Sequence, residues 1–238
     1  QSKRAAFYAK RNGKDRIQVY EGGINEESQD KETGYEQVAP TVYALVAAID
    51  AKDSFTFQHS TNVSQYAVLL AQKLGLSRND IQTVKVAGLL HDIGKIGIPE
   101  SILKKAGKLT NEEYEIIKGH VEASIDIIRH LPSLDYVIPA VIGHHERYDG
   151  KGYPRRIAGE DIPLTARILC VADSFDAMTS KRCYKKAFPI EVAREKLLQD
   201  AGRQFDPDLV YKFVECLDNG SITLVKAEET VDNLKEML

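Results

Sequence analysis

Cysteine and long apolar runs are both scarce in this chain of 238 residues. Its three cysteines, Cys170, Cys183 and Cys216, are odd in number and form no Cys-x-x-Cys pair. This pattern favours a reduced setting and predicts no disulfide. The longest uninterrupted apolar run, Val42 to Ile49, falls far short of the roughly 18 to 20 residues that a membrane span requires. We therefore expect a cytoplasmic chain that makes no contact with a membrane.

A large excess of either charge is also missing. The formal net charge is −3, from 32 Lys and Arg against 35 Asp and Glu. No global basic field favours nucleic acid, and we expect no DNA binding. Hydrophobic residues make up 43% of the chain and charged residues 28%, which excludes a disordered, collagen-like or disulfide-scaffold protein. The length predicts one core with an appendage.

The first 39 residues differ in composition from the rest. The sequence begins without methionine, and residues 1–20 resemble the end of a helix followed by a short strand, which indicates the remnant of another domain. Residues 21–39 are rich in Glu, Asp, Gly, Ser and Asn and predict an acidic linker. A folded domain is expected over residues 40–220, followed by a C-terminal helix over 221–238. The apolar stripe of that last helix could pack on the core or on a second copy, so a homodimer remains one of two alternatives.

Beyond Pro40, apolar residues recur with a helical period nearly everywhere, and no strand pattern competes. The sequence therefore predicts an all-α bundle. After two early helical stretches, the expected helices span residues 80–92, 110–129, 134–145, 164–178, 190–199 and 208–217. One long interruption, residues 147–164, is rich in Gly and Pro, which is typical of a functional loop.

Histidine and aspartate side chains stand at helix ends and on apolar faces, where burial is costly unless something binds them. A single such histidine is more often a hydrogen-bonded core residue, so the joint pattern carries the argument. Imidazole and carboxylate ligands suit Fe, Mn or Zn, and one carboxylate can bridge two ions about 3.5 to 4 Å apart. We expect two divalent ions, Fe or Mn with Zn as the alternative. The predicted ligands are His59, His91, Asp92 as the bridge, His120, His144, His145 and Asp173.

Lys95 follows Asp92 by three positions and His91 by four. If the helix continues for one more turn, all three side chains face one site. Lys95 is a poor metal ligand but a good partner for an attacking hydroxide or a phosphate oxygen. The alternative is a solvated cation that offsets the helix dipole.

Five motifs resemble the HD-GYP branch of the HD-domain phosphohydrolases. They are residues 91–99 (HDIGKIGIP), 144–154 (HHERYDGKGYP), 162–168, 173–179 and 204–207. The likeness covers roughly residues 40 to 218. It implies an all-helical, metal-dependent bacterial phosphodiesterase that hydrolyses cyclic di-GMP to linear pGpG or onward to GMP. It also implies attack by a metal-bridging hydroxide, in line, on phosphorus.

The resemblance also assigns roles to single residues. It makes Lys95 the catalytic lysine beside Asp92, and it assigns substrate contacts to Gly152, Tyr153, Pro154, Asp176, Arg182 and Lys185. Tyr153 would offer a stacking face for guanine, whereas Arg147 and Asp149 would order the loop. One departure concerns Phe55, which stands where three-metal members have glutamate. It favours two ions and argues against complete conversion to GMP.

Residues 5–20 resemble the last helix and strand of a GGDEF domain, which implies such a domain upstream; the alternative is a basic amphipathic helix that leads into the linker. Two other functions remain open at this point. One is a sensor or interaction module that binds cyclic di-GMP without turnover. The other is an HD-type phosphohydrolase for another nucleotide.

Overall fold

The computed structural model describes residues 39–42, 44–49, 56–105, 107–180 and 187–224. Within these ranges every element is a helix apart from one isolated bridge between Ala201 and Phe205. The predicted all-α fold is confirmed. The compact unit that holds these residues begins at Tyr35, near the predicted domain start. The predicted N-terminal remnant and most of the linker lie outside the described residues.

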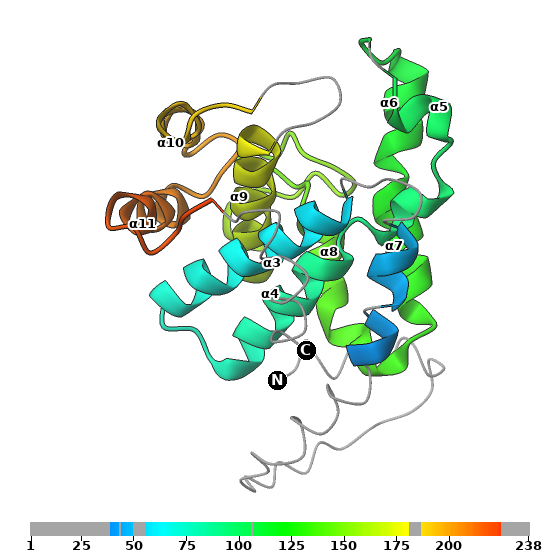
Figure 1. Ribbon diagram of the computed structural model, residues 1–238, viewed down its shortest axis with the longest axis horizontal. Helices are drawn as coiled ribbons and strands as arrows, with labels where there is room; N and C mark the ends of the chain where they lie inside the picture. Colours follow the sequence, from blue (N-terminus) through cyan, green and yellow to red (C-terminus); the bar gives the residue numbers. More distant parts are fainter. Residues whose placement is uncertain (1–38, 43, 50–55, 106, 181–186, 225–238) are drawn as a thin grey trace, which may run out of the picture. The chain divides into compact units, whose positions relative to one another are not determined.

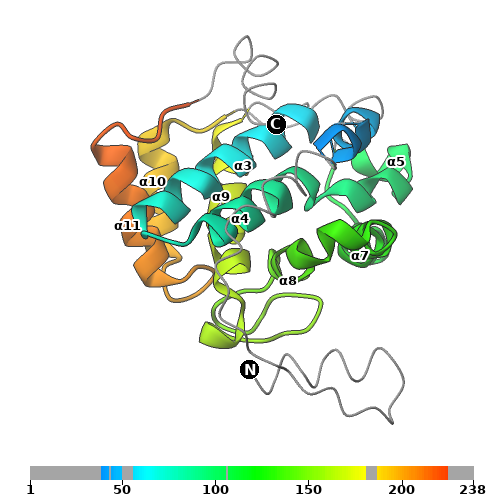
Figure 2. The same cartoon turned by 90° about the horizontal axis from the view of Figure 1, so that it is seen from below.

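Three helices form the centre of this unit: α3 (Thr56–Lys73), α4 (Arg78–Leu90) and α9 (Leu164–Thr179). α3 packs against both α4 and α9, as Figures 1 and 2 show. Gly88 permits the close approach of α4, because a Cβ there would lie 2.6 Å from the Cα of Ser64. Tyr66, Phe175 and Phe213 join α3, α9 and α11 (Pro207–Asp218) through edge-to-face ring contacts.

The predicted helix over residues 110–129 is two helices, α6 (Asn111–Lys118) and α7 (His120–Arg129). Gly119 ends the first and begins the second, with a φ of −60° and a ψ of −16°, so the break falls immediately before His120. Thr110 and Glu113 form a capping box at the start of α6. The short helix α5 (Glu100–Leu103) precedes it, and Figure 1 shows both at one end of the unit.

The predicted helix over residues 134–145 is also interrupted. A 3-10 helix, η2 (Pro132–Val137), leads into α8 (Ile138–Gly143), which has Pro139 in its first turn. Proline fits the first turn of a helix but removes an N–H donor further along, so a new helix begins there. α8 ends at Gly143, and His144 and His145 therefore follow it in a turn.

Three further helices follow the predicted bounds to within one residue: α10 (Ile190–Gln199), α11 and α9. The helix predicted over residues 80–92 is α4, which begins and ends two residues earlier. The predicted C-terminal helix is wrong for residues 221–224, which are not helical. Gly220 has a φ of 74°, and the N–H of Ile222 bonds back to Cys216 O at 3.0 Å, so α11 closes there. Residues 225–238 lie outside the described residues. In the described part of the chain, no helix is long and apolar enough for a membrane span.

Candidate metal centre

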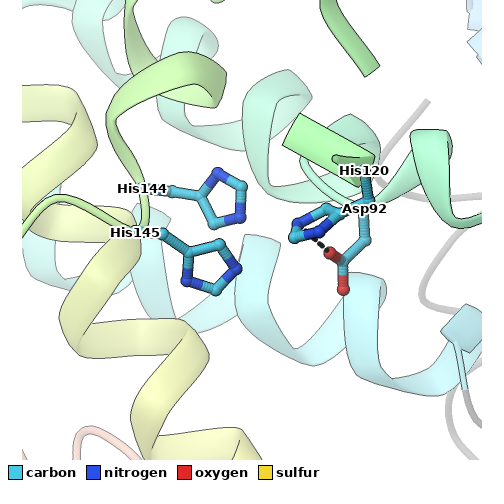
Figure 3. Close-up of side chains that lie close together, drawn as sticks. All are labelled: Asp92, His120, His144 and His145. Atoms are coloured by element: carbon cyan, nitrogen blue, oxygen red, sulfur yellow. Dashed lines mark ion pairs between the residues drawn. The ribbon is translucent and has the colours of Figure 1, made fainter. Parts of the chain in front are cut away.

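Five of the predicted ligands lie in the turns that follow α4 and α8 and at the start of α7, whereas His59 lies on α3 and Asp173 on α9. Figure 3 shows Asp92, His120, His144 and His145 pointing toward one another. The seven predicted ligands fall into two groups, and within each group the ligand atoms lie within 4.8 Å of one another. The first group is Asp92, His120, His144 and His145, and the second group is His59, His91 and Asp173. Of these seven, only His145 and Asp173 are not fully buried.

Asp92 lies between the two groups. Its Oδ1 is 3.2 Å from His120 Nε2, in the first group. Its Oδ2 is 3.3 Å from His91 Nε2 and 3.6 Å from His59 Nε2, in the second group. A carboxylate with one oxygen toward each group has the geometry of a bridging ligand.

Backbone carbonyls fix the orientation of three histidine rings. Each Nδ1 bonds the carbonyl three residues earlier: His91 to Gly88 at 2.8 Å, His120 to Ile117 at 2.5 Å and His144 to Val141 at 2.5 Å. A carbonyl only accepts hydrogen bonds, so the proton is on Nδ1 and the lone pair of Nε2 faces the centre.

Within the part of the chain that the structure describes, several of these inward atoms lie near one another but make no hydrogen bond. The Nε2 atoms of His59, His91, His120 and His144 and the Oδ1 atom of Asp92 are buried without a hydrogen bond. Buried polar atoms are otherwise almost always satisfied. Converging, unsatisfied imidazole and carboxylate lone pairs fit divalent metal ions.

Asp176 holds the fourth ring. Its Oδ2 accepts a hydrogen bond from His59 Nδ1 at 2.7 Å, and its Oδ1 accepts bonds from Asn62 Nδ2 at 2.7 Å and Ser180 Oγ at 2.9 Å. The residue is completely buried. A direct contact with substrate, as the sequence predicted, does not fit this position. We propose instead that Asp176 orients His59 from behind.

Asp176→Asn is therefore expected to weaken metal binding by about 10- to 100-fold. The amide would no longer carry the charge that holds the N–H of His59 and raises the basicity of its ring. Titration of the metal-free protein against a chelator of known affinity measures the change.

A matched control is Asp206→Asn, which alters another buried carboxylate that pairs with Arg167 away from the centre. We expect this control to lower the melting temperature and to leave metal affinity unchanged. Normal metal affinity in Asp176→Asn, combined with weaker substrate binding, would restore the substrate role.

Burial keeps the histidines of the first group neutral. It lowers the pKa of His120, lowers that of His144 further, and lowers that of His145 to about 3. All three rings are therefore unprotonated near neutral pH, as metal ligands must be.

The second group holds charge in the metal-free protein. Burial alone would lower the pKa of His59, but the nearby carboxylates of Asp173 and Asp92 and the hydrogen bond to Asp176 raise it well above the usual value. Burial opposes ionisation of Asp92, yet the charge of Lys95 and the nearby rings of His91 and His59 bring its pKa well below the usual value. A proton on His59 thus occupies the place between carboxylates that a cation would take, and metal binding would release it.

Lys95 reaches the centre by a different path from the one predicted. α4 ends at Leu90, and Lys95 lies on the following 3-10 helix, η1 (Ile93–Gly97). Its Nζ nevertheless lies 2.5 Å from Asp92 Oδ2. The predicted grouping of Lys95 with Asp92 is therefore present in the structure.

Ser124 is a positioning residue that the sequence analysis missed. Its Oγ donates to His91 O at 3.0 Å and accepts from Gly94 N at 2.8 Å, so one buried hydroxyl on α7 holds both ends of the turn that carries Asp92. The available signal was a serine four residues after His120, on the same helix face.

The Gly/Pro-rich loop covers one side of the first group. Arg147 orders it with two hydrogen bonds to Asp149, at 3.0 and 2.8 Å, in agreement with the predicted role of this pair. Gly152 has no room for a side chain, because a Cβ would lie 2.3 Å from Arg147 N. The Tyr153 ring stacks on His145, with centroids 4.8 Å apart and an interplanar angle of 28°.

Three residues that the sequence analysis relates to the site lie outside the described residues. They are Arg182 and Lys185, two of the predicted substrate contacts, and Phe55, the departure from the three-metal pattern. Cys183 lies there too, whereas Cys170 and Cys216 are free and buried.

Comparison with known proteins shows the family of this chain. Residues 44–209 match the family model of the HD domain. A 3′3′-cGAMP-specific phosphodiesterase of Vibrio cholerae is 41% identical over 74% of this chain and 34% of its own length. A cyclic di-GMP phosphodiesterase response regulator of Xanthomonas campestris is 41% identical over 74% of this chain and 47% of its own length. The chain thus spans less than half the length of these two relatives.

A solved structure supports the same fold. A cyclic GMP-AMP-specific phosphodiesterase of Vibrio cholerae superposes with a TM-score of 0.61 at 20% identity, over 77% of this chain and 49% of that chain. The family match includes α3, α4, α7, α8 and α9, which carry or adjoin the ligands. The chain belongs to the HD-domain family.

Proposed function

We propose that this chain is a metal-dependent phosphodiesterase that hydrolyses cyclic di-GMP to linear pGpG. The observation that carries the proposal is the pair of ligand groups joined by Asp92. In this reaction water adds to phosphorus, the bond from phosphorus to one 3′ oxygen breaks, and the protons of water remain on the 3′ hydroxyl and in solution. The relative from Xanthomonas campestris, named for this activity, supports the choice of substrate.

Two divalent ions fit the donor set. One ion would be held by His59, His91 and Asp173, and the other by His120, His144 and His145. Asp92 would be a ligand of both ions. Bound ions of this kind polarise a phosphodiester and lower the pKa of water toward neutrality. Fe or Mn is the proposed metal, with Zn as the alternative, because imidazole and carboxylate ligands accept all three.

Lys95 supplies a positive side chain beside the proposed ligands. Its ammonium is partly exposed and contacts Asp92, so it lies at the edge of the centre where a phosphate oxygen would sit. Negative charge that develops on phosphate oxygens during attack would be stabilised there by a hydrogen bond from Nζ. Lys95 is thus proposed as a catalytic residue and not as a ligand.

Lys95→Met separates these two roles. We expect kcat for cyclic di-GMP to fall by about 100-fold, because a preorganised cation is lost, while the metal content of the purified protein is retained. Elemental analysis and steady-state kinetics on the same sample measure both quantities. Loss of metal in proportion to activity would instead make Lys95 part of the support of the centre.

The test of the proposed function is hydrolysis of cyclic di-GMP, followed by chromatography of pGpG and GMP. The protein is purified without oxygen and supplied with Mn or Fe. Turnover that stops at pGpG is the expected result. Binding of cyclic di-GMP by metal-loaded protein without any product would overturn the proposal in favour of a sensor.

Cyclic GMP-AMP is a second candidate substrate, because a relative named for it is 41% identical to this chain. The ratio of kcat/KM for the two cyclic dinucleotides, measured in competition, decides between them. A ratio above about 10 in either direction, which corresponds to about 1.4 kcal/mol, assigns the substrate.

The proposal extends to the cellular compartment, the preceding region of the protein and the oligomeric state. We propose that the chain works in the bacterial cytoplasm, downstream of a GGDEF-like region. A homodimer through the C-terminal residues stays a prediction, and sedimentation at several protein concentrations tests it.

A further inference from the structure

A row of aromatic rings leads away from the metal centre. The rings of His120 and His145 have centroids 5.1 Å apart, and Tyr153 stacks on His145 at 4.8 Å. Tyr114, on α6, meets Tyr153 edge to face at 6.5 Å. Along this row the rings pass from a buried metal ligand to a tyrosine that is 47% exposed.

Tyr114 and Lys118 share one face of α6, four residues apart. Lys118 Nζ lies 5.4 Å from the centroid of Tyr114 and 5.7 Å from that of Tyr153. The ammonium also pairs with Glu115, whose side chain is 68% exposed. The Lys118 side chain is itself only 22% exposed, but its partner is in solvent, so the carboxylate can be exchanged for another anion at little cost.

Tyr153 is less available for stacking on guanine than the sequence analysis expected. One face of its ring is covered by His145, so that face is not available to a nucleobase. The ring of Tyr114 is the more exposed aromatic surface at the outer end of the row. A cyclic dinucleotide held at the centre through one phosphodiester still has its bases and a second phosphate to bind elsewhere on the protein.

We infer that Tyr114 and Lys118 form a nucleotide subsite beside the metal centre, in which Tyr114 stacks on one base of a cyclic dinucleotide and Lys118 pairs with the phosphate that is not cleaved. The inference rests on the proposed function for its ligand class. Stacking on an aromatic ring accepts every base, so this subsite would contribute affinity to cyclic di-GMP and cyclic GMP-AMP alike.

The test measures equilibrium binding of a slowly hydrolysed bisphosphorothioate analogue of cyclic di-GMP to the metal-loaded protein. Tyr114→Leu is expected to raise Kd about tenfold, which is within the range of one base stacked on an aromatic side chain. Tyr114→Phe retains the ring and is expected to bind within about twofold of the parent. Lys118→Gln is expected to make the salt dependence of Kd less steep.

Tyr211→Leu is the matched control, because Tyr211 is also an exposed helical tyrosine and lies on α11, which does not carry the centre. An unchanged Kd in Tyr114→Leu, an equal loss in Tyr211→Leu, or a loss accompanied by lower metal content would each overturn the subsite. Binding with these expected effects but without turnover would leave the subsite standing and overturn the phosphodiesterase. A parent protein that does not bind the analogue would overturn both.

Discussion

Asp92→Asn is expected to lower kcat by at least about 1,000-fold and to remove metal from both ligand groups together. The carboxylate of Asp92 places one oxygen toward each group, at 3.2 Å from His120 Nε2 and 3.3 Å from His91 Nε2. Asparagine has nearly the same shape, but it replaces one oxygen by an amide that donates hydrogen bonds and carries no charge. A bridging ligand that serves two ions is lost with a single substitution.

The charge balance of the centre makes the effect larger. In the parent protein, Asp92 faces the Lys95 ammonium at 2.5 Å and the ring of His59, which carries a proton when metal is absent. Without the carboxylate, these cations would repel an incoming metal ion with less compensation. Metal ions are therefore expected to bind more weakly to both ligand groups.

Metal content by elemental analysis and turnover of cyclic di-GMP measure the two effects on the same preparation. Asp218→Asn serves as the control, because Asp218 is exposed and pairs with Arg194 on the surface. Full activity and normal metal content in Asp92→Asn would remove Asp92 as the bridge.

The clustering of the predicted ligands could be anticipated from the sequence for a physical reason. Histidine and aspartate next to apolar helical runs are costly to bury alone, so the positions of His91, Asp92, His144 and His145 in the chain already indicate a shared partner. The helical periodicity likewise predicted α9, α10 and α11 to within one residue. Both signals are local, because each is contained within a few turns of one helix.

The residues that hold the proposed ligands in position through hydrogen bonds could not be predicted in this way. The family resemblance assigned Asp176 to substrate binding, but in the structure this residue accepts a hydrogen bond from His59, which lies 117 residues earlier in the chain. Ser124 holds a turn 33 residues earlier in the chain, through His91 O. Such contacts depend on how α3, α7 and α9 pack, which no local pattern contains. The breaks at Gly119 and Pro139 were missed because apolar periodicity continues across them.

Gly94→Ala is expected to damage both the fold and the metal centre. A Cβ at Gly94 would lie 2.0 Å from the carbonyl oxygen of His120, 2.5 Å from Ser124 N and 2.9 Å from the Cβ of Ala123. Two of these neighbours are backbone atoms of α7, which cannot move aside as a flexible side chain would. The helix must therefore shift by about 1 Å or more to restore ordinary contact distances.

That shift would carry His120 away from Asp92 and would strain the hydrogen bond from Gly94 N to Ser124 Oγ. We expect the free energy of unfolding to fall by about 3 kcal/mol, which lowers Tm by roughly 6 to 12 °C. A displacement of about 1 Å at a reacting centre is expected to reduce kcat by about 100-fold. Thermal unfolding and kinetics on metal-loaded protein measure these changes.

Gly97→Ala is the matched control within the same 3-10 helix, because a Cβ at Gly97 meets nothing within 4 Å. Its unfolding free energy is expected to stay within about 0.5 kcal/mol of the parent. If Gly94→Ala and Gly97→Ala behaved alike, the close packing of α7 on the turn after Asp92 could not be what holds His120 in place. If only Gly94→Ala lost stability and metal together, the same contact would position the ligand and stabilise the fold.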